Sequence, residues 1–349
     1  MVETISDIDS FSKLKDTWIR LEREPCMRIF QTYQWCRAAW DLVLSTNPDN
    51  KLFILHWRRG EESVILPTYL DKKGILRFIA DDDSDVCDAV YGNGENHHIA
   101  YREMAKIILQ DNRIKGVWFQ KLYGESEACN YFGVVLPGAF VARDNAFSWL
   151  EVKSSDDFIA SQTHMPSKDR ADLKGLLRSV KKYSLVVKSK DNGDMFPRKA
   201  LLSLREDMRQ RKIRDKSYLD DRQVAFVETI YENGGCYIAL LFDEDSVVAA
   251  NVLLKKDYRV LSWVFLYTNP RMSSALYVKY LSEIKHGRDY IFDFGVGVYS
   301  YKIGTFRPKM GITVSLRYGK SNIKQFIALI LTNVRFLKDW VKAIYGKGH

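Results

Sequence analysis

The sequence predicts an α/β protein made of two similar halves. Its 349 residues exceed the ~100–200 residues of a typical domain. A hydrophobic fraction of 46% and an aromatic fraction of 13% are enough to build a core. The same order of elements is expected twice along the chain: a hairpin, a third strand, a helix and a further strand.

The first half follows from local patterns. Phe11, Leu14 and Trp18 fall on one helical stripe, and the Arg-Arg-Gly-Glu-Glu stretch between two β-rich runs is typical of a hairpin turn. An acidic, glycine-bearing loop covers 81–98, and 137–143 is expected to be a connection. The predicted elements are helices at 10–21 and after the cap Thr32, strands at 51–57, 63–70 and 75–80, a helix at 99–109 and a strand at 116–122.

The second half contains three consecutive strands joined by the turns Asp-Glu-Asp and Lys-Lys-Asp, which predict an antiparallel meander. A helix is expected after this meander, with Gly287 at its C-terminal end. The predicted elements are a strand at 149–152, a basic helix at 167–182, a strand at 184–189, helices at 197–213 and 220–232, strands at 236–242, 246–254 and 259–267, a helix at 273–287 and a strand at 289–295.

Cysteine, histidine and N-terminal patterns exclude several classes. The five cysteines are scattered and form no Cys-x-x-Cys pair, and the histidines form no His-Glu-x-x-His motif, so we expect no disulfide framework and no metal. The N-terminal stretch is acidic and polar, unlike a signal peptide, and no run approaches the ~18 apolar residues of a membrane span. We therefore expect a cytoplasmic protein.

The net charge of +9 is concentrated in one segment. Residues 168–216 hold sixteen Lys and Arg against seven Asp and Glu, which is +9 by itself, so the rest of the chain is near neutral. Such a segment indicates an anionic partner, namely phosphates, a nucleotide-linked substrate or tRNA, and not DNA. The alternative is a solvated helical face. The tail 320–349 is expected to be a basic amphipathic helix that docks on the core or contacts a membrane surface.

A candidate anion site lies where strand 259–267 leads into the following helix. A helix N-terminus carries unpaired N–H groups and a partial positive charge, which suit a phosphate or pyrophosphate. Ser273 and Ser274 would add hydroxyl donors and Arg271 a charge. Alternatively, Ser273 serves only as the helix N-cap.

The stretch Asp-Phe-Gly-Val-Gly-Val-Tyr-Ser-Tyr-Lys-Ile-Gly-Thr-Phe-Arg-Pro, residues 293–308, places an acid, a tyrosine and a lysine behind a strand. Its spacing resembles a signature of the CelD/BcsL-type acetyltransferases, a branch of the GNAT superfamily. It is also similar to the Phe-Lys-x-Gly-Phe segment of the Fem-type aminoacyl-transferases of cell-wall synthesis. The resemblance continues over about 300 residues. It includes a Trp-x-x-Leu element, a Phe-x-x-x-x-Trp element that ends at Trp35, and a Ser-Asp segment that contains Asp85.

The resemblance implies two tandem GNAT-like halves, each a mixed, mostly antiparallel sheet flanked by helices. The halves would be 1–145 and 146–319, followed by the tail helix. In such folds two neighbouring strands, here 259–267 and 289–294, splay apart, and the arm of an acyl donor pairs with the exposed strand edge. The branch usually has a glycine near the start of the helix at Ser273, where this chain has Ser274-Ala275.

The resemblance also implies roles for individual residues. Asp293 would be the general base, Tyr301 would protonate the leaving thiolate, and Lys302 would stabilise negative charge or hold an acceptor phosphate. Each has a structural alternative: Asp293 as a turn cap or as the ion-pair partner of Lys302 or Arg307, Tyr301 as a core residue and Lys302 as a surface charge. The donor would contact Val264, Phe265, Leu266, Arg271, Ser273, Ser274 and Ala275, and the acceptor Trp35, Asp85, Arg209 and Arg211.

The sequence thus predicts an N-acyltransferase of cell-envelope or polysaccharide synthesis. It would move an acyl group from acetyl-CoA or another acyl-CoA to an amine on a sugar nucleotide, a polysaccharide precursor or a peptide. The second hypothesis is a Fem-like transferase that uses aminoacyl-tRNA. The third is a catalytically silent GNAT-like scaffold, which the altered helix start and the absence of an unambiguous base keep open.

Overall fold

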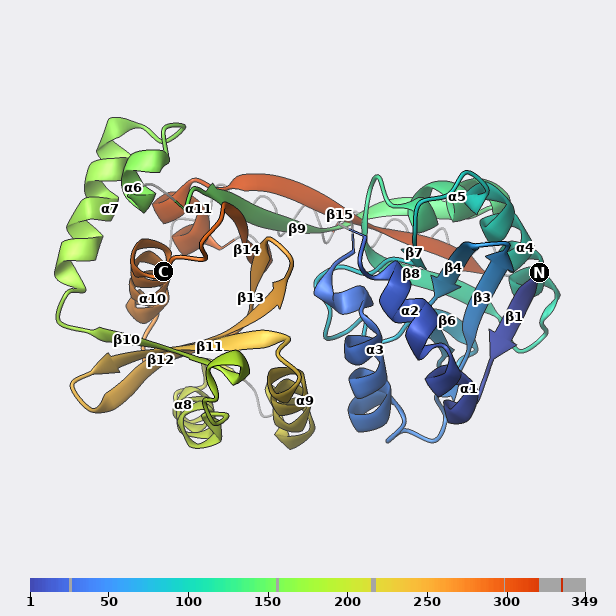
Figure 1. Ribbon diagram of the computed structural model, residues 1–349, viewed down its shortest axis with the longest axis horizontal. Helices are drawn as coiled ribbons and strands as arrows, with labels where there is room; N and C mark the ends of the chain where they lie inside the picture. Colours follow the sequence, from blue (N-terminus) through green and yellow to red (C-terminus); the bar gives the residue numbers. More distant parts are fainter. Residues whose placement is uncertain (25–26, 155–156, 215–217, 298, 320–333, 335–349) are drawn as a thin grey trace. The chain divides into compact units, whose positions relative to one another are not determined.

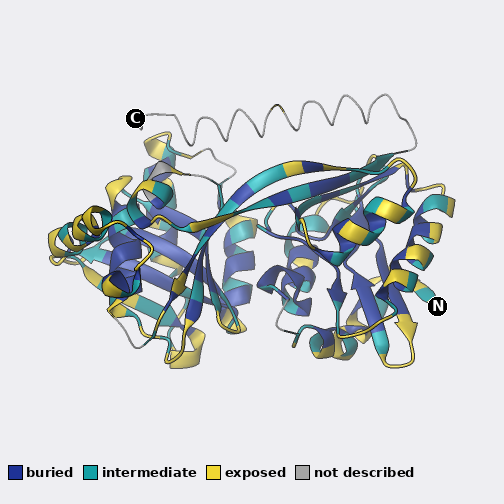
Figure 2. Cartoon of the chain, turned by 90° about the horizontal axis from the view of Figure 1, so that it is seen from above, coloured by how far each residue is buried: buried dark blue, intermediate teal, exposed yellow. Residues whose placement is uncertain are grey.

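The computed structural model describes residues 1–24, 27–154, 157–214, 218–297, 299–319 and 334. They form two compact units (Figure 1). Unit 1 comprises Met1–Ala146 together with residues 312–319, and unit 2 comprises Phe147–Gly311. The sequence placed 312–319 in the second half, whereas these residues belong to unit 1. Each unit has its own buried hydrophobic cluster (Figure 2).

Unit 1 contains two sheets. One has the order β1-β3-β4-β7, and the strands β15, β8, β6, β5 and β2 follow one another in the second. The elements are β1 (Val2–Ile5), α1 (Ile8–Lys13), α2 (Lys15–Leu21), η1 (Ile29–Gln31), α3 (Tyr33–Ala39), η2 (Trp40–Leu44), β2 (Lys51–Leu52), β3 (Ile54–Arg59), β4 (Glu62–Leu66), β5 (Thr68–Leu70), β6 (Ile75–Phe78), β7 (Val90–Tyr91), α4 (His97–Gln110), β8 (Gly116–Tyr123) and α5 (Glu127–Val135).

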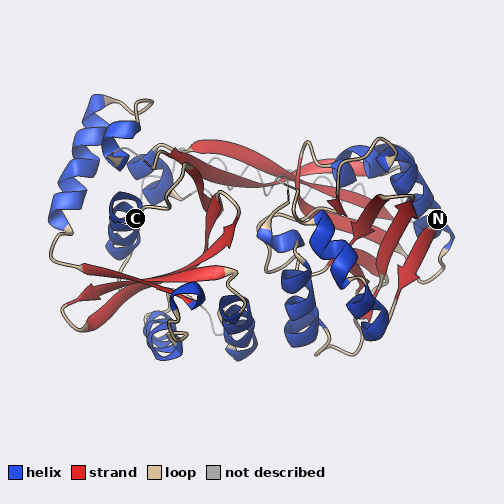
Figure 3. Cartoon of the chain, viewed as in Figure 1, coloured by secondary structure: helices blue, strands red, loops and turns tan. Residues whose placement is uncertain are grey.

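Unit 2 contains strands in the order β10-β11-β12-β13-β14-β9. Helices α8 and α9 contact one face of this sheet and α10 lies on the other (Figures 1 and 3). The elements are β9 (Phe140–Val152), α6 (Phe158–Ser161), α7 (Ser167–Ser179), β10 (Ser184–Ser189), η3 (Lys190–Asn192), α8 (Arg198–Gln210), α9 (Asp221–Glu232), β11 (Cys236–Asp243), β12 (Ser246–Lys256), β13 (Arg259–Tyr267), α10 (Arg271–Glu283), β14 (Tyr290–Val296) and α11 (Ser300–Phe306). The next strand, β15 (Lys309–Gly319), joins the second sheet of unit 1.

The repeated order of elements is confirmed. The β3–β4 hairpin and the β11–β12–β13 meander are antiparallel, as their turns predicted. In unit 1 the parallel strands β6 and β8 are connected through α4, and in unit 2 the parallel strands β13 and β14 are connected through α10. Thr32 caps α3 by accepting a hydrogen bond from the Trp35 N–H at 3.2 Å.

Several elements differ from the sequence prediction. The expected strand 63–70 is divided at Pro67, so β4 and β5 join different sheets, because proline offers no N–H to a ladder. The expected helix 10–21 is two helices that meet at Leu14. The stretch 137–143, expected to be a connection, leads directly into the 13-residue strand β9. Local patterns did not reveal α5, α6, α11 or β15.

Strand β9 runs from unit 1 into unit 2, and strand β15 completes a sheet that belongs to the other half of the sequence. Residues 147–152 of β9 pair with β14 in unit 2, although β9 follows α5 of unit 1. Residues 313–319 of β15 pair with β8 in unit 1, although β15 follows α11 of unit 2. The sheet of unit 1 is therefore complete only when residues 313–319 join it, whereas the paired strands of unit 2 lie within the continuous stretch 147–311.

The predicted tail helix falls on 320–349, of which only Val334 is described, so that prediction lies outside the described residues. Within the parts of the chain that the structure describes, no helix combines the length and apolar character needed to span a membrane.

Candidate active site

The predicted separation of two strands occurs in unit 2. Strands β13 and β14 pair at Arg259, Val260 and Leu261 only, opposite residues 291–293, whereas β13 continues to Tyr267. A bulge follows immediately, because the register with β12 shifts by one residue around Trp263. A buried chain of hydrogen bonds holds this bulge: the Ser262 hydroxyl contacts Asn251 at 3.0–3.1 Å and the Tyr277 hydroxyl at 2.7 Å. The divergence is thus a fixed feature of the core.

Beyond the bulge, the backbone groups of β13 alternate in direction. The Thr268 N–H donates to Val248 of β12, whereas the Tyr267 N–H donates to the Met208 sulfur and the Phe265 carbonyl accepts from the Tyr218 hydroxyl. Since antiparallel strands alternate their hydrogen-bonded pairs, Val264 and Leu266 direct their backbone groups to β12. Of the three predicted donor contacts on β13, Phe265 is therefore the one that faces the open edge.

The acid and the lysine of the 293–308 stretch hold the same peptide group. The Asp293 carboxylate accepts from the Gly295 N–H at 2.9 Å, and the Lys302 ammonium donates to the Phe294 carbonyl at 2.5 Å. Both side chains are buried, with exposed fractions of 2% and 4%. Gly295 and Gly297 have φ of +73° and +103°, which glycine adopts without strain. The residues thus come together at the end of β14, where they fix a turn.

Asp293 also forms an ion pair that the sequence did not reveal. Its second oxygen lies 3.4 Å from Arg259, at the start of β13. Arg307, one of the predicted partners of Asp293, instead pairs with Asp169 at 2.9 Å. The Arg259 contact and the N–H donor both stabilise the charged carboxylate. The Lys302 ammonium lies 4.9 Å from the centroid of the Tyr299 ring, and the Tyr301 side chain lies outside the described residues.

Helix α10 begins at Arg271, two residues earlier than expected, after the N-cap Pro270. Ser273 has an exposed fraction of only 1% and Ala275 is equally buried, whereas Ser274 is half-buried and Arg271 is exposed. Arg271 and Ser274 are therefore the predicted donor contacts with side chains at the surface of this turn.

The basic residues predicted to bind the acceptor contact the chain itself. Arg209 donates to the Tyr218 carbonyl at 3.0 Å, while Arg211 donates to the Thr268 carbonyl and pairs with Asp207 at 2.8 Å. They hold the segment after α8 beside the end of β13. Tyr218, whose hydroxyl reaches β13, was missed because a single tyrosine in a basic loop carries no motif.

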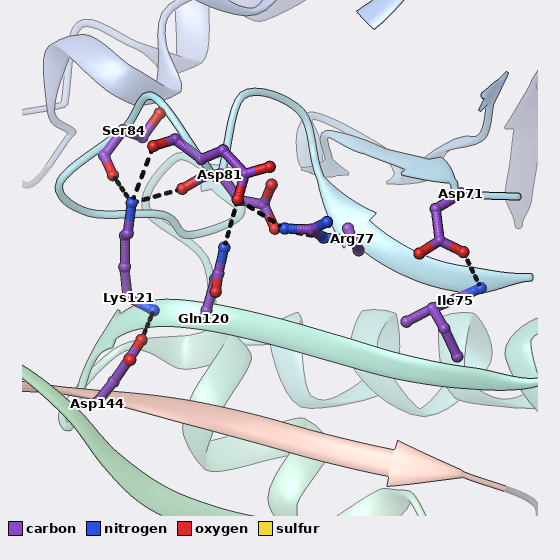
Figure 4. A network of polar contacts seen from close by, with 9 residues as sticks. Asp71, Ile75, Arg77, Asp81, Ser84, Gln120, Lys121 and Asp144 are labelled. Atoms are coloured by element: carbon purple, nitrogen blue, oxygen red, sulfur yellow. Dashed lines mark hydrogen bonds and ion pairs between the residues drawn. The ribbon is translucent and has the colours of Figure 1, made fainter. Parts of the chain in front are cut away.

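The corresponding strands of unit 1, β6 and β8, also pair briefly, at two residue pairs. In unit 1, the loop that follows β6 crosses the position beyond this short β6–β8 pairing (Figure 4). The Lys121 ammonium donates to the carbonyls of Asp81 at 2.7 Å and Ser84 at 2.6 Å, and the Cys87 N–H donates to the Lys121 carbonyl at 2.9 Å. The same loop is tied to β6 by the Arg77–Asp81 ion pair at 2.8 Å.

The two predicted acceptor contacts of unit 1 lie at this loop. Trp35 is fully buried, and its indole N–H donates to the Ser84 hydroxyl at 3.0 Å, while Asp85 is half-buried within the loop. Nearby, Asp88 is buried and accepts from the Ala89 N–H at 2.8 Å. Burial raises the pKa of Asp88 to about 7, an effect that its backbone donors only partly offset.

Among the described residues, no group of three or more His, Cys, Asp or Glu side chains is arranged to hold a metal ion. The four cysteines whose positions are described are free and buried. Burial raises the pKa of the Cys36 and Cys236 thiols well above their usual range, so these thiols are poor nucleophiles.

The fold resembles solved structures at very low sequence identity. A conserved protein of unknown function from Bacteroides thetaiotaomicron has a TM-score of 0.60 and 10% identity, over 92% of this chain and 100% of that one. L-PGS from Bacillus licheniformis has a TM-score of 0.54 and 12% identity, over 91% and 96%. FemX has a TM-score of 0.51 and 10% identity, over 94% and 99%.

No protein-family model and no curated protein sequence matches the chain. The structural likeness confirms the predicted fold class, two similar halves that each have a mixed, mostly antiparallel sheet flanked by helices. At this level of identity it establishes the fold alone, and the CelD/BcsL-type branch stays a prediction.

Proposed function

We propose that the chain is an N-acyltransferase whose reaction takes place where β13 and β14 diverge. The observation that carries this proposal is the part of β13 after Leu261, which does not pair with β14, together with the turn that Asp293 and Lys302 hold on β14. A donor arm laid along that edge would bring its carbonyl next to the Phe265 N–H, which would stabilise the developing oxyanion.

The proposed donor is acetyl-CoA or another acyl-CoA, and the proposed acceptor is an amine on a sugar nucleotide, a polysaccharide precursor or a peptide. The amine nitrogen attacks the acyl carbon, the new C–N bond forms and the C–S bond breaks. Asp293 would take the proton from the amine, and Tyr301 would give a proton to the leaving thiolate. Lys302 would stabilise the negative charge on the intermediate or hold an acceptor phosphate.

Aminoacyl-tRNA is the second candidate donor, and the start of α10 favours it. Ser273 is buried there, and Ser274-Ala275 stand where the branch has a glycine, so close backbone approach by a pyrophosphate is restricted. The positive charge of residues 168–216 is compatible with either donor, because both carry phosphates. Cytoplasmic location and membrane contact through 320–349 stay predictions.

Thermal shift with acetyl-CoA, longer acyl-CoAs and tRNA separates these candidates. A ligand present at 100 times its Kd stabilises the folded state by ~2.7 kcal/mol. A shift with acyl-CoA followed by transfer to an amine acceptor supports the first donor, and a shift with tRNA alone supports the second. If none of the donors produces a shift, the chain is better described as a GNAT-like scaffold.

A further inference from the structure

The open edge of β13 is in contact with one short segment of unit 2. Met208 at the end of α8 accepts from the Tyr267 N–H at 3.4 Å, and the Tyr218 hydroxyl donates to the Phe265 carbonyl at 3.0 Å. These are the backbone groups of β13 that face away from β12. Side chains of α8 and of the segment after it thus take hydrogen-bonding positions that a neighbouring strand would otherwise fill.

Tyr218 is held firmly in this position. Arg209 donates to its backbone carbonyl at 3.0 Å, Arg205 donates to the carbonyl of Leu219 at 3.1 Å, and the guanidinium of Arg214 lies 4.6 Å from the centroid of its ring. Leu219 has a φ of +50°, in the left-handed region that non-glycine residues rarely adopt. The contact with Phe265 is therefore built by several interactions, including a backbone conformation that carries strain.

The chemistry of the contact favours a stable donor–acceptor pair. Burial raises the pKa of the Tyr218 phenol, so the hydroxyl stays protonated and able to donate. An amide N–H on a donor arm that ran along β13 would need the same carbonyl of Phe265. Two donors then compete for one acceptor position on the strand edge.

We propose that Tyr218 is a specificity-determining residue, which weakens the binding of donors with an amide-bearing arm, such as pantetheine thioesters, by occupying the Phe265 carbonyl. A donor whose activated carbonyl is not followed by an amide, such as an aminoacyl ester of adenosine, does not meet this competition. The inference rests on the proposed function, since it assigns the donor to the β13 edge.

The test compares wild type with Tyr218→Phe, which keeps the ring and removes the hydroxyl. We expect acetyl-CoA to bind the variant about 2- to 10-fold more tightly, the factor that one net hydrogen bond corresponds to. Binding of an aminoacyl ester of adenosine should not change, so the ratio of the two Kd values should shift. Tyr267→Phe, which removes a hydroxyl from the same strand, is the matched control and should leave the ratio as it is.

A purely structural role for Tyr218 would lower the melting temperature without moving this ratio. Arg209→Gln, which releases the backbone of Tyr218, should change the ratio in the same direction as Tyr218→Phe. Unchanged or weaker acetyl-CoA binding by Tyr218→Phe would overturn the inference, as would undetectable binding by both proteins. Transfer to an amine is measured separately: transfer with an unchanged ratio refutes only the role of Tyr218, and a changed ratio without transfer refutes only the proposed function.

Discussion

Asp293 has a structural role in the fold, and the proposed reaction gives it a second role as the base. It accepts from the Gly295 N–H in a buried contact and pairs with Arg259 in a partly buried one. The acid of the 293–308 stretch therefore has a structural reason to be there, whether or not it also takes a proton from an amine. Kinetics measured per folded molecule separate the two roles.

Asp293→Asn should lower kcat by ~10²–10⁴-fold, the usual contribution of general acid–base catalysis, because the amide keeps the shape but is not a base. It should also lower the melting temperature, since Arg259 loses its buried partner. The control is Arg259→Gln, which breaks the same ion pair and leaves the carboxylate in place. If both variants lose turnover equally once the folded fraction is accounted for, or if Asp293→Asn keeps full turnover, Asp293 is not the base.

The raised pKa of Asp88 predicts that the stability of unit 1 depends on pH. Its pKa is about 7 in the folded chain against 3.8 for an ordinary aspartate, so between these values the folded state binds more protons than the unfolded state. The free energy of unfolding contributed by this group is then present below about pH 4 and falls as pH rises toward 7, by on the order of 2–4 kcal/mol.

Replacement of Asp88 by Asn should remove this slope, because the amide does not titrate and still accepts from the Ala89 N–H. The measurement is urea denaturation of both proteins between pH 4.5 and 7.5. We expect wild type to lose stability relative to the variant as pH increases. A constant difference across this range would show that Asp88 titrates normally.

At the scale of elements, the divergence of β13 and β14 depends on contacts between distant parts of the sequence. Strand lengths and the helix between them could be predicted, because apolar periodicity and turn residues are local signals. The bulge at Trp263 could not, since it depends on a hydrogen-bond chain from Asn251 to Tyr277. The edge-facing role of Phe265 follows from that bulge and was therefore also beyond the reach of the sequence.

The connection between β14 and α11 can be tested at Lys302. Lys302→Met retains much of the stem and removes the ammonium that holds the Phe294 carbonyl. We expect a loss of about 1–3 kcal/mol of stability, because a buried carbonyl is left without its donor, and a fall in kcat/KM that is largest for a phosphorylated acceptor. Lys309→Met, which removes an exposed cation paired with Glu151, should change either quantity little. A less stable but fully active Lys302→Met protein would limit Lys302 to a structural role.

At the scale of the whole molecule, each unit has its own pair of parallel strands connected through a helix, but the strand edge beyond that pair differs between the units. In unit 1, the loop after β6 crosses the corresponding position and is held there by the Lys121 ammonium. The repeat could be predicted from the order of elements, whereas the position of this loop could not. Its anchor, Lys121, lies about forty residues further along the chain and binds backbone carbonyl groups, which leave no signal in the sequence.

We therefore expect one donor site per chain. Calorimetric titration with the donor that produces a thermal shift should give a stoichiometry of one, and photo-crosslinking should label residues of unit 2. Lys121→Met, which removes the anchor of the loop, should not add a second site, since the Arg77–Asp81 ion pair still ties the loop to β6. Two donors bound per chain, or label confined to unit 1, would contradict this assignment.

The position of β15 near the end of the described sequence has a consequence for synthesis on the ribosome. Unit 1 lacks the partner of β8 until residues 313–319 have been made, although its other elements end near residue 146. At 5–20 residues per second, the unpaired edge of β8 waits roughly 10–35 s for its neighbour while the second half is translated. During that interval a nascent chain offers an exposed strand edge to other nascent chains, so a chaperone that covers residues 116–123 is expected to raise the yield of folded protein.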